Sequence, residues 1–216
     1  MEYMITAVVT IVLAAIALGF YMDAKRTKDL KAIADSLKFT FSKTGENLLP
    51  SLGGFDLFSK GHAKKAKNVM NGNSNGIDVT IMDYQYTTGT GKNSHTWSQT
   101  VMLFRSEFLQ LPGFALRQEG LFDKISGLFG YQDIDFDTHP EFSKHYLLRG
   151  VDEDGIRSVF SDMLIAFYEQ HRGLNTEGDG GGLIFYRASK RVSPKDLKIF
   201  MEEGFGVFAL LAKRNR

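Results

Sequence analysis

GIDVTIMDYQYTTGTGKNSHTWSQTVMLF, residues 76 to 104, carries the clearest β-sheet signal in the chain. Two runs rich in β-branched and aromatic residues, 76 to 86 and 95 to 104, enclose the segment TTGTGKNS, whose residues are nearly all turn formers. This arrangement predicts an antiparallel hairpin. The polar centre is then the tip of the hairpin, between two strands that supply apolar side chains to a core.

The GTGK of this tip (89 to 92) resembles part of a phosphate-binding loop. Such a loop needs G-x-x-x-x-G-K-[ST] leading from a strand into a helix, so that backbone amides and a helix N-terminus face the phosphates. Here the residue five before Gly91 is Tyr86, and Lys92 is followed by Asn93 and a strand-like run. We therefore predict no nucleotide site and no cofactor at the tip.

The elements around the hairpin predict an α+β fold. The helical pattern is strongest after Asp152, Glu153 and Asp154, which suit a first helical turn, and its apolar stripe comprises Ile156, Val159, Phe160, Met163, Leu164 and Phe167. Other helices are expected at 121 to 129 and after Ser193-Pro194, the last kinked or split near Gly204 and Gly206. Strands are expected at 37 to 42, 55 to 58, 68 to 70, 131 to 137, 145 to 150 and 183 to 187. We interpret LPGFALRQEG (111 to 120) as a connection and TEGDGGG (176 to 182) as a flexible loop.

This order of elements lacks a regular βαβ rhythm, which favours antiparallel pairing in one soluble domain with packed helices. The domain is expected to cover residues 38 to 216. It follows a membrane anchor at 1 to 22 and a juxtamembrane helix at 23 to 37. In that helix Leu30, Ile33, Ala34 and Leu37 form a stripe that can dock on the domain.

The anchor is MITAVVTIVLAAIALGFYM, Met4 to Met22, which contains no charged residue. At ~1.5 Å per residue it spans about 28 Å, close to the hydrocarbon thickness of a bilayer. Tyr3 and Tyr21 lie near its ends, where aromatic rings prefer the membrane interface. The chain begins without a positive n-region, and the apolar run ends in bulky residues rather than a small-x-small cleavage site. We interpret the segment as an uncleaved single-pass anchor rather than a signal peptide.

Basic residues predict how the protein is oriented. Lys25, Arg26, Lys28 and Lys31 follow the apolar run and no Lys or Arg precedes it, which places the domain in the cytoplasm and the N-terminus outside. The chain contains no cysteine, which agrees with a reducing compartment and removes thiolate chemistry. A formal net charge of +1 argues against a nucleic-acid partner.

A second basic group, SKGHAKKAK, supplies Lys60, Lys64, Lys65 and Lys67. On a tethered cytoplasmic domain these lysines would contact anionic lipid or a partner, but a solvated loop explains them equally well. For Lys25, Arg26, Lys28 and Lys31 we favour the membrane. Trp97, the only tryptophan, is a candidate partner anchor, although a cross-strand aromatic cluster with Tyr84 and Tyr86 is the more usual arrangement.

The acidic run Asp133, Asp135 and Asp137 suggests a calcium loop. The sixth position is Thr138 instead of glycine and the twelfth is Lys144 instead of glutamate, so we predict an exposed strand without a metal. His139 and His145 could join the aspartates in space, which keeps a metal-dependent enzyme as an alternative function. No G-x-S-x-G or H-E-x-x-H motif is present, and we predict no catalytic residues.

DYQYTTGTGKN with the following QTV, LPGFALRQE, and the run YLLRGVDEDGIRSVF resemble an uncharacterised family of bacterial proteins with an N-terminal membrane span and a domain of unknown function. The resemblance covers most of the chain beyond residue 30. It implies a single-pass protein of the bacterial inner membrane and carries no catalytic residues. We therefore expect a membrane-tethered, non-enzymatic module that binds a protein partner or the anionic lipid surface. A subunit of a larger membrane assembly is a further alternative.

Overall fold

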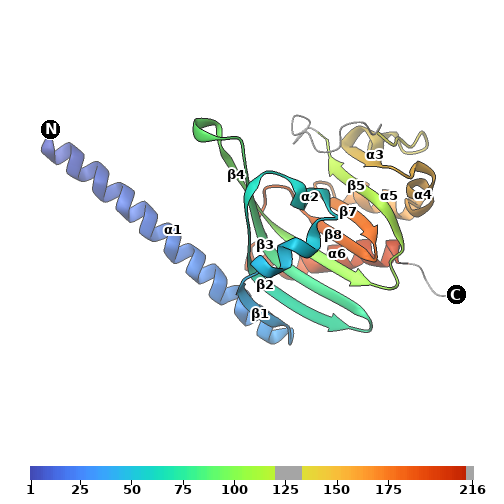
Figure 1. The fold of residues 1–216 in the computed structure, drawn as a ribbon, viewed down its shortest axis with the longest axis horizontal. Coiled ribbons are helices and arrows are strands. Elements are labelled where there is room, and N and C mark those ends of the chain that lie inside the picture. The colour runs from blue at the N-terminus through green and yellow to red at the C-terminus, as the bar shows by residue number, and fades with distance from the viewer. Residues whose placement is uncertain (120–132, 213–216) are drawn as a thin grey trace.

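The computed structural model describes residues 1–119 and 133–212. A long N-terminal helix leads into a single eight-stranded antiparallel sheet with helices on both faces, as Figure 1 shows. The α+β fold with antiparallel pairing is confirmed. The predicted helix at 121 to 129 and the first two residues of the predicted strand at 131 to 137 lie outside the described residues.

The strands are arranged in the order β1-β2-β3-β4-β8-β7-β5-β6. Their bounds are β1 Thr40–Thr44, β2 His62–Ser74, β3 Ile77–Thr88, β4 His95–Ser106, β5 Leu111–Gln118, β6 Tyr146–Gly150, β7 Asn175–Gly180 and β8 Gly182–Tyr186. The α-helices are α1 Glu2–Ser36, α2 Asp56–Ser59, α3 Pro140–His145, α4 Glu153–Val159, α5 Asp162–Gln170 and α6 Leu197–Leu211. Short 3₁₀ segments are η1 Glu46–Leu52, η2 Gly91–Asn93 and η3 Pro194–Asp196.

The predicted hairpin is confirmed as β3 and β4, the third and fourth strands of the eight-stranded sheet. Their register is unbroken from Ile77 opposite Ser106 to Thr88 opposite His95. Because side chains alternate between faces, Ile81 belongs to one apolar cluster and Met82 to the other. The hairpin therefore contributes to both cores of the domain.

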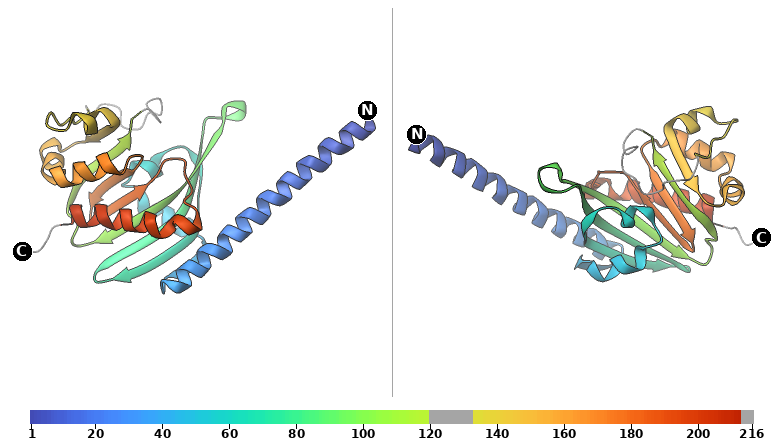
Figure 2. Two further views of the ribbon diagram at one scale, coloured as in Figure 1. Left: turned by 180° about the vertical axis from the view of Figure 1, so that it is seen from behind. Right: turned by 45° about the horizontal axis from the view of Figure 1, so that its top comes forward.

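The two faces are covered by different parts of the chain. Helices α1, α4, α5 and α6 supply Leu30, Ile156, Leu164 and Phe200 to the larger apolar cluster on one face. The segment from η1 to α2 supplies Leu52 and other apolar residues to the smaller cluster on the opposite face. Figure 2 shows α6 lying along the first face, seen from behind.

Three expectations for local structure are wrong. Residues 56 to 58, expected in a strand with Phe55, belong to the short helix α2, for which Phe55 is the N-cap. LPGFALRQ is strand β5 rather than a connection, and NTEGDG is strand β7 rather than a loop. In β7 the chain is polar and glycine-rich, yet Thr176 and Glu177 are almost completely buried. Long-range partners across the sheet, which local composition does not reveal, create these strands. Conversely, described residues 133 to 137 do not form the expected strand.

The predicted helices also differ in detail. The stripe that begins at Ile156 belongs to two helices, because Ser161 caps α5 by accepting a hydrogen bond from the backbone N–H of Leu164, at 3.4 Å. Helix α6 is continuous through Gly204 and Gly206, contrary to the expected kink. A side chain at Gly204 would meet the sulfur of Met102 at 2.8 Å, so this glycine permits close packing of α6 on the sheet.

Helix α1 runs without a break from the apolar segment into the juxtamembrane segment. Leu30 and Ala34, from the predicted docking stripe, are buried against the sheet, while Leu37 at the end of the stripe is exposed. From Met1 to Lys25, every residue whose side chain is described is exposed. The first part of α1, up to Lys25, is therefore exposed, and the part around Leu30 and Ala34 belongs to the core of the domain.

Candidate functional site

The apolar part of α1 is the only membrane-length helix among the described residues. The helix from Tyr3 to Ser36 is long and apolar enough to cross a bilayer, and none of its most apolar window is buried in the domain. The structure thus contains the predicted N-terminal apolar helix, followed by a folded domain. The residues just after this apolar part, where helix and domain meet, form the candidate site.

Arg26 and Asp83 join the helix to the sheet at this place. Their charged side chains are only 12% and 8% exposed, and two guanidinium nitrogens of Arg26 donate to the two carboxylate oxygens of Asp83 at 2.6 and 2.8 Å. The third nitrogen donates to the carbonyl oxygen of Val192 at 2.7 Å. Asn68 and Thr100 also donate to Asp83, so the carboxylate is fully supplied with partners.

Two further contacts extend this joint along the helix. Thr27 donates to the side-chain oxygen of Asn68 at 2.9 Å, and Arg191 forms an ion pair with Asp23 at 3.0 Å. Asp23 directly follows Met22, the last residue of the apolar run. The joint therefore begins at the predicted edge of the membrane.

A cleft of about 80 Å³ opens between α1 and strands β2, β3 and β4 beside this joint. It is far smaller than the roughly 300–1,000 Å³ of typical small-molecule pockets, so it suits one polar group of a larger ligand. Its charged lining comprises Lys65, Lys67 and Arg191 with Asp23 and Asp83. Both acids are paired with arginines, whereas Lys65 and Lys67 are exposed and have no ion-pair partner among the described residues. The cleft is left with excess positive charge.

The other residues of the predicted contact set lie in different surroundings. Lys25 and Lys28 are exposed on α1, and Lys31 is exposed but paired with Asp35 at 2.8 Å. Arg26 is turned into the joint rather than toward lipid, which corrects its predicted role. Lys60 and Lys64 are also turned inward: Lys60 is 7% exposed beside Asp56, and Lys64 donates to the carbonyl oxygen of Phe58 at 2.7 Å.

Trp97 lies directly opposite Tyr86 in the hairpin, as the cross-strand interpretation predicted. Its indole N–H donates to the hydroxyl of Thr88 at 2.9 Å, and its ring meets that of His95 edge to face, with centroids 4.1 Å apart. Tyr84 and Tyr86 stack on each other one step deeper in the smaller core. Trp97 is half-buried, so it borders the exposed tip.

A second charged network is enclosed on the opposite face, beneath α2. Arg117 pairs with Asp56 and lies 3.8 Å from Glu177, whose side chain is only 2% exposed. Glu177 accepts hydrogen bonds from the backbone N–H of Leu57 and from the hydroxyl of Tyr186, each at 3.0 Å. With Lys60 beside Asp56, this network contains two bases and two acids.

Burial changes the acid–base properties of this enclosed network. Burial lowers the pKa of Lys60, and the negative charge of Glu177 only partly offsets that shift. Burial also raises the pKa of Tyr86 to about 12, with Glu177 adding to the increase. A closed, charge-balanced cluster of this kind holds α2 against the sheet, and it presents no surplus charge to a ligand.

The acidic and histidine residues considered for a metal are not assembled into a site. His139 contacts Asp162 at 3.2 Å, and His145 lies beside Glu141 and Arg172. Asp133 accepts a hydrogen bond from the backbone N–H of Leu148 at 2.9 Å. Within residues 1–119 and 133–212, no three His, Asp or Glu side chains converge as metal ligands. The metal-dependent alternative therefore has no structural support in this part of the chain.

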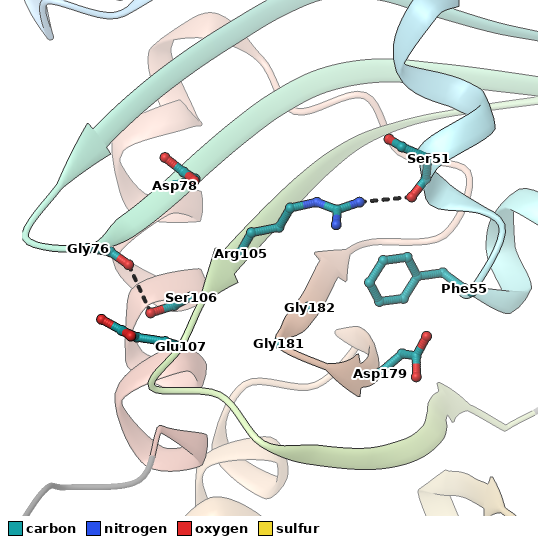
Figure 3. A pocket seen from close by; sticks show the side chains of 11 residues that line it. Ser51, Phe55, Gly76, Asp78, Arg105, Ser106, Glu107, Asp179, Gly181 and Gly182 are labelled. Atoms are coloured by element: carbon teal, nitrogen blue, oxygen red, sulfur yellow. Dashed lines mark hydrogen bonds between the residues drawn. The ribbon is translucent and has the colours of Figure 1, made fainter.

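A larger depression of about 440 Å³ lies at the end of the sheet away from the hairpin tip (Figure 3). Asp78, Glu107 and Asp179 contribute negative charge to it, and Arg105 crosses it to donate to the carbonyl oxygen of Ser51 at 2.8 Å. Phe55 is its one aromatic lining residue. Small-molecule sites are predominantly apolar, so this acidic depression has the character of an open polar surface.

Sequence reasoning missed Asp83 and Arg191, which complete the joint. Asp83 stands between Met82 and Tyr84, in the middle of a strand whose neighbouring residues are apolar or aromatic, and a charge at such a position signals a buried partner. Arg191 lies in the loop between strand β8 and the 3₁₀ segment η3, and no local sequence pattern distinguishes it. Only the packing of α1 on the sheet brings these residues to residues 23 and 26.

Comparisons with known proteins add a fold likeness. No protein-family model matches the chain, and no curated protein matches it. Among solved structures, the mycobacterial trehalose monomycolate transport factor A, TtfA, is similar with a TM-score of 0.62 at 13% sequence identity. The alignment covers 88% of this chain and 98% of that chain. At this identity the likeness concerns the fold.

Proposed function

We propose that the protein is a membrane-anchored interaction module whose domain lies against the cytoplasmic leaflet of a bacterial inner membrane and contacts anionic lipid headgroups. The observation that carries this proposal is the cleft beside the Arg26–Asp83 joint. It adjoins the last apolar residue of α1, and it is lined by Lys65 and Lys67, which have no ion-pair partner among the described residues. Each basic residue near an anionic leaflet contributes ~1 kcal/mol of attraction.

The basic residues after the span support the cytoplasmic orientation. Orientation is decided during insertion, before the domain has folded, so Arg26 and Lys31 count although both are paired in the folded protein. Lys25 and Lys28 remain exposed and add to the positive surface at the same level of α1. Together these residues favour the side of the membrane that carries anionic lipids.

Native mass spectrometry of the full-length protein, released from nanodiscs with equal amounts of phosphatidylglycerol and phosphatidylcholine, tests the lipid contact. The wild type is expected to retain phosphatidylglycerol preferentially. Lys65→Gln should lower that preference about fivefold, the equivalent of ~1 kcal/mol. Lys144→Gln, an exposed lysine of α3, is the matched control and should have no effect. Equal retention of both lipids by the wild type would refute the proposal.

Binding of a protein partner is the second candidate function, and the fold shared with TtfA supports it. That protein is a transport factor, and the similarity extends over 98% of its chain. An accessory role in membrane transport would use the domain surface that faces away from the bilayer, where Asp78, Glu107 and Asp179 surround the acidic depression. Affinity purification in detergent, with Glu107→Lys/Asp179→Lys as the comparison, tests this role: a partner lost only from the variant would support it.

A further inference from the structure

The β3–β4 hairpin extends beyond the strands that flank it. On one side, pairing with β2 reaches only as far as Thr87, opposite His62, the first residue of β2. On the other side, β8 pairs with β4 only from Val101 to Arg105. The residues from Gly89 to Thr96 are all exposed. In Figures 1 and 2 this tip projects from the sheet toward the same side as the N-terminal end of α1.

Contacts between α1 and the sheet establish the same direction independently of any view. Arg26 binds Asp83 and Thr100, whereas Asp23, one turn nearer the N-terminus, lines the cleft with Gln85 and Ser98. Gln85 and Ser98 are register partners two positions closer to the tip. Moving toward the membrane along α1 is therefore moving toward the tip along the hairpin.

The hairpin tip reaches further toward the N-terminal end of α1 than the point where the apolar run of α1 ends, at Met22. Asp23 adjoins the apolar run and lies level with Gln85. Strand β3 continues for three residues beyond Gln85, to Thr88, which is about 10 Å at ~3.3 Å each, and the turn from Gly89 to Ser94 lies beyond that point. If hairpin and helix both stood perpendicular to the membrane, the tip would lie well inside a hydrocarbon layer ~30 Å thick. Lipid-exposed polar loops do not occur there, so the helix must lean until the tip reaches the headgroups. Tilts of 0–40° are usual for membrane helices.

The chemistry of the tip suits the headgroup layer. No acidic residue occurs between Asp83 and Glu107, and the exposed segment from Gly89 to Thr96 reads GTGKNSHT. Lys92 provides positive charge, and the half-buried ring of Trp97 lies at the base of the tip, as aromatic residues do at membrane interfaces. Hydrogen bonds hold the tip in shape, including one between the ring of His62 and the carbonyl oxygen of Gly89 at 3.0 Å.

We propose that the hairpin tip, residues 88 to 97, is a second membrane contact that rests in the lipid headgroup layer of the leaflet next to the domain. The inference rests on the proposed anchoring of α1 in the bilayer, but it does not depend on the cleft lysines. Two contacts, one at the joint and one at the tip, fix the tilt of the domain against the membrane.

The absence of cysteine and the single tryptophan make the test direct. Single variants Asn93→Cys, Asn73→Cys and Ala15→Cys place a fluorophore at the tip, at the opposite end of the sheet and in the middle of the apolar run. Full-length protein in phosphatidylcholine–phosphatidylglycerol nanodiscs is then exposed to headgroup-nitroxide lipids and to aqueous iodide. We expect lipid quenching at Asn93→Cys several-fold stronger than at Asn73→Cys, with iodide giving the reverse order. Nitroxide lipids should also quench Trp97 of the unlabelled protein.

The three positions separate the possible failures. Iodide access to Ala15→Cys would show that α1 is not in the bilayer and would overturn the anchoring itself. A protected Ala15→Cys together with equal iodide quenching at Asn93→Cys and Asn73→Cys would leave the anchor standing and overturn the tip contact. The tip would then be a water-exposed surface available to a partner protein.

Discussion

The pair Arg26–Asp83 holds the N-terminal helix α1 against one face of the sheet. A second network holds α2 against the other face and consists of Arg117, Asp56, Lys60 and Glu177. Both networks are buried, and both are balanced in charge. They differ in their neighbours. The joint is bordered by Lys65 and Lys67, which have no ion-pair partner among the described residues, whereas the acid Glu177 of the α2 network accepts a hydrogen bond from the buried Tyr186. Burial alone therefore does not identify a functional site, and the charge left over beside a network is the more informative quantity.

Removing the joint should produce the largest effect. Arg26→Ala leaves Asp83 buried without a positive partner, so we expect the free energy of unfolding to fall by about 3–5 kcal/mol. Denaturant unfolding of the full-length protein in detergent measures this loss. Arg191→Ala, which breaks the more exposed pair with Asp23, is the control and should cost less than about 1 kcal/mol. Similar losses of unfolding free energy from the two variants would contradict the difference expected between the buried pair Arg26–Asp83 and the exposed pair Arg191–Asp23.

Alkaline pH should destabilise the folded protein through Tyr86, whose pKa is raised by burial and by Glu177 of the α2 network. Below pH 10 Tyr86 is protonated in both states, but between its ordinary pKa of 10.0 and its folded pKa of about 12 the unfolded chain loses the proton first. Stability therefore falls as pH rises through this window, by about 1.4 kcal/mol per pH unit for one such tyrosine.

Deprotonation of Lys60, in the same network, changes the stability of the protein in the opposite direction. Its lowered pKa means that the folded protein loses the proton first, so its contribution to stability rises with pH until the ordinary value of 10.5 and then stays constant. Phenolate absorbance and circular dichroism, followed together from pH 9 to 12, measure the balance, and Tyr86→Phe should weaken the alkaline loss. Ionisation of the buried tyrosines ahead of unfolding would contradict this prediction.

The smallest effect on stability is expected for an ion pair on the exposed side of helix α1. Lys31 and Asp35 are 58% and 60% exposed, so Lys31→Ala should change the free energy of unfolding by no more than about 0.5 kcal/mol. The unfolding experiment used for Arg26→Ala measures it. A loss above 2 kcal/mol would mean that docking of α1 depends on this pair. The expected difference between the buried side of α1, with Arg26, and its exposed side, with Lys31, would then be wrong.

The parts of the fold that sequence reasoning predicted are those encoded by periodicity. The apolar run, the docking stripe with Leu30 and Ala34, and the hairpin around Tyr86 and Trp97 each follow from residues close together in the chain. Strand β7 was missed because Glu177 and its glycine neighbours read as a loop. What buries Glu177 is its contacts with Leu57 and Tyr186, which belong to distant segments.

The candidate site was only half predictable for the same reason. Lys65 and Lys67 were identified from a cluster of basic residues, but the same cluster includes Lys60 and Lys64, which are turned inward. Alternation along a strand separates inward from outward residues only when the register is known. The register shifts between His62 and Lys65 and again between Lys67 and Met70, and nothing in the local sequence indicates either irregularity.

The unbroken run of α1 has a mechanical consequence. Between residues 20 and 44 the chain contains neither glycine nor proline, so no hinge separates the apolar segment from the docked segment. A thicker or thinner bilayer changes the inclination of a helix that crosses it. Through a rigid junction that change becomes a rotation of the whole domain, which raises or lowers the far end of the sheet. If α1 crosses the bilayer as proposed, the protein couples membrane thickness to the height of its domain.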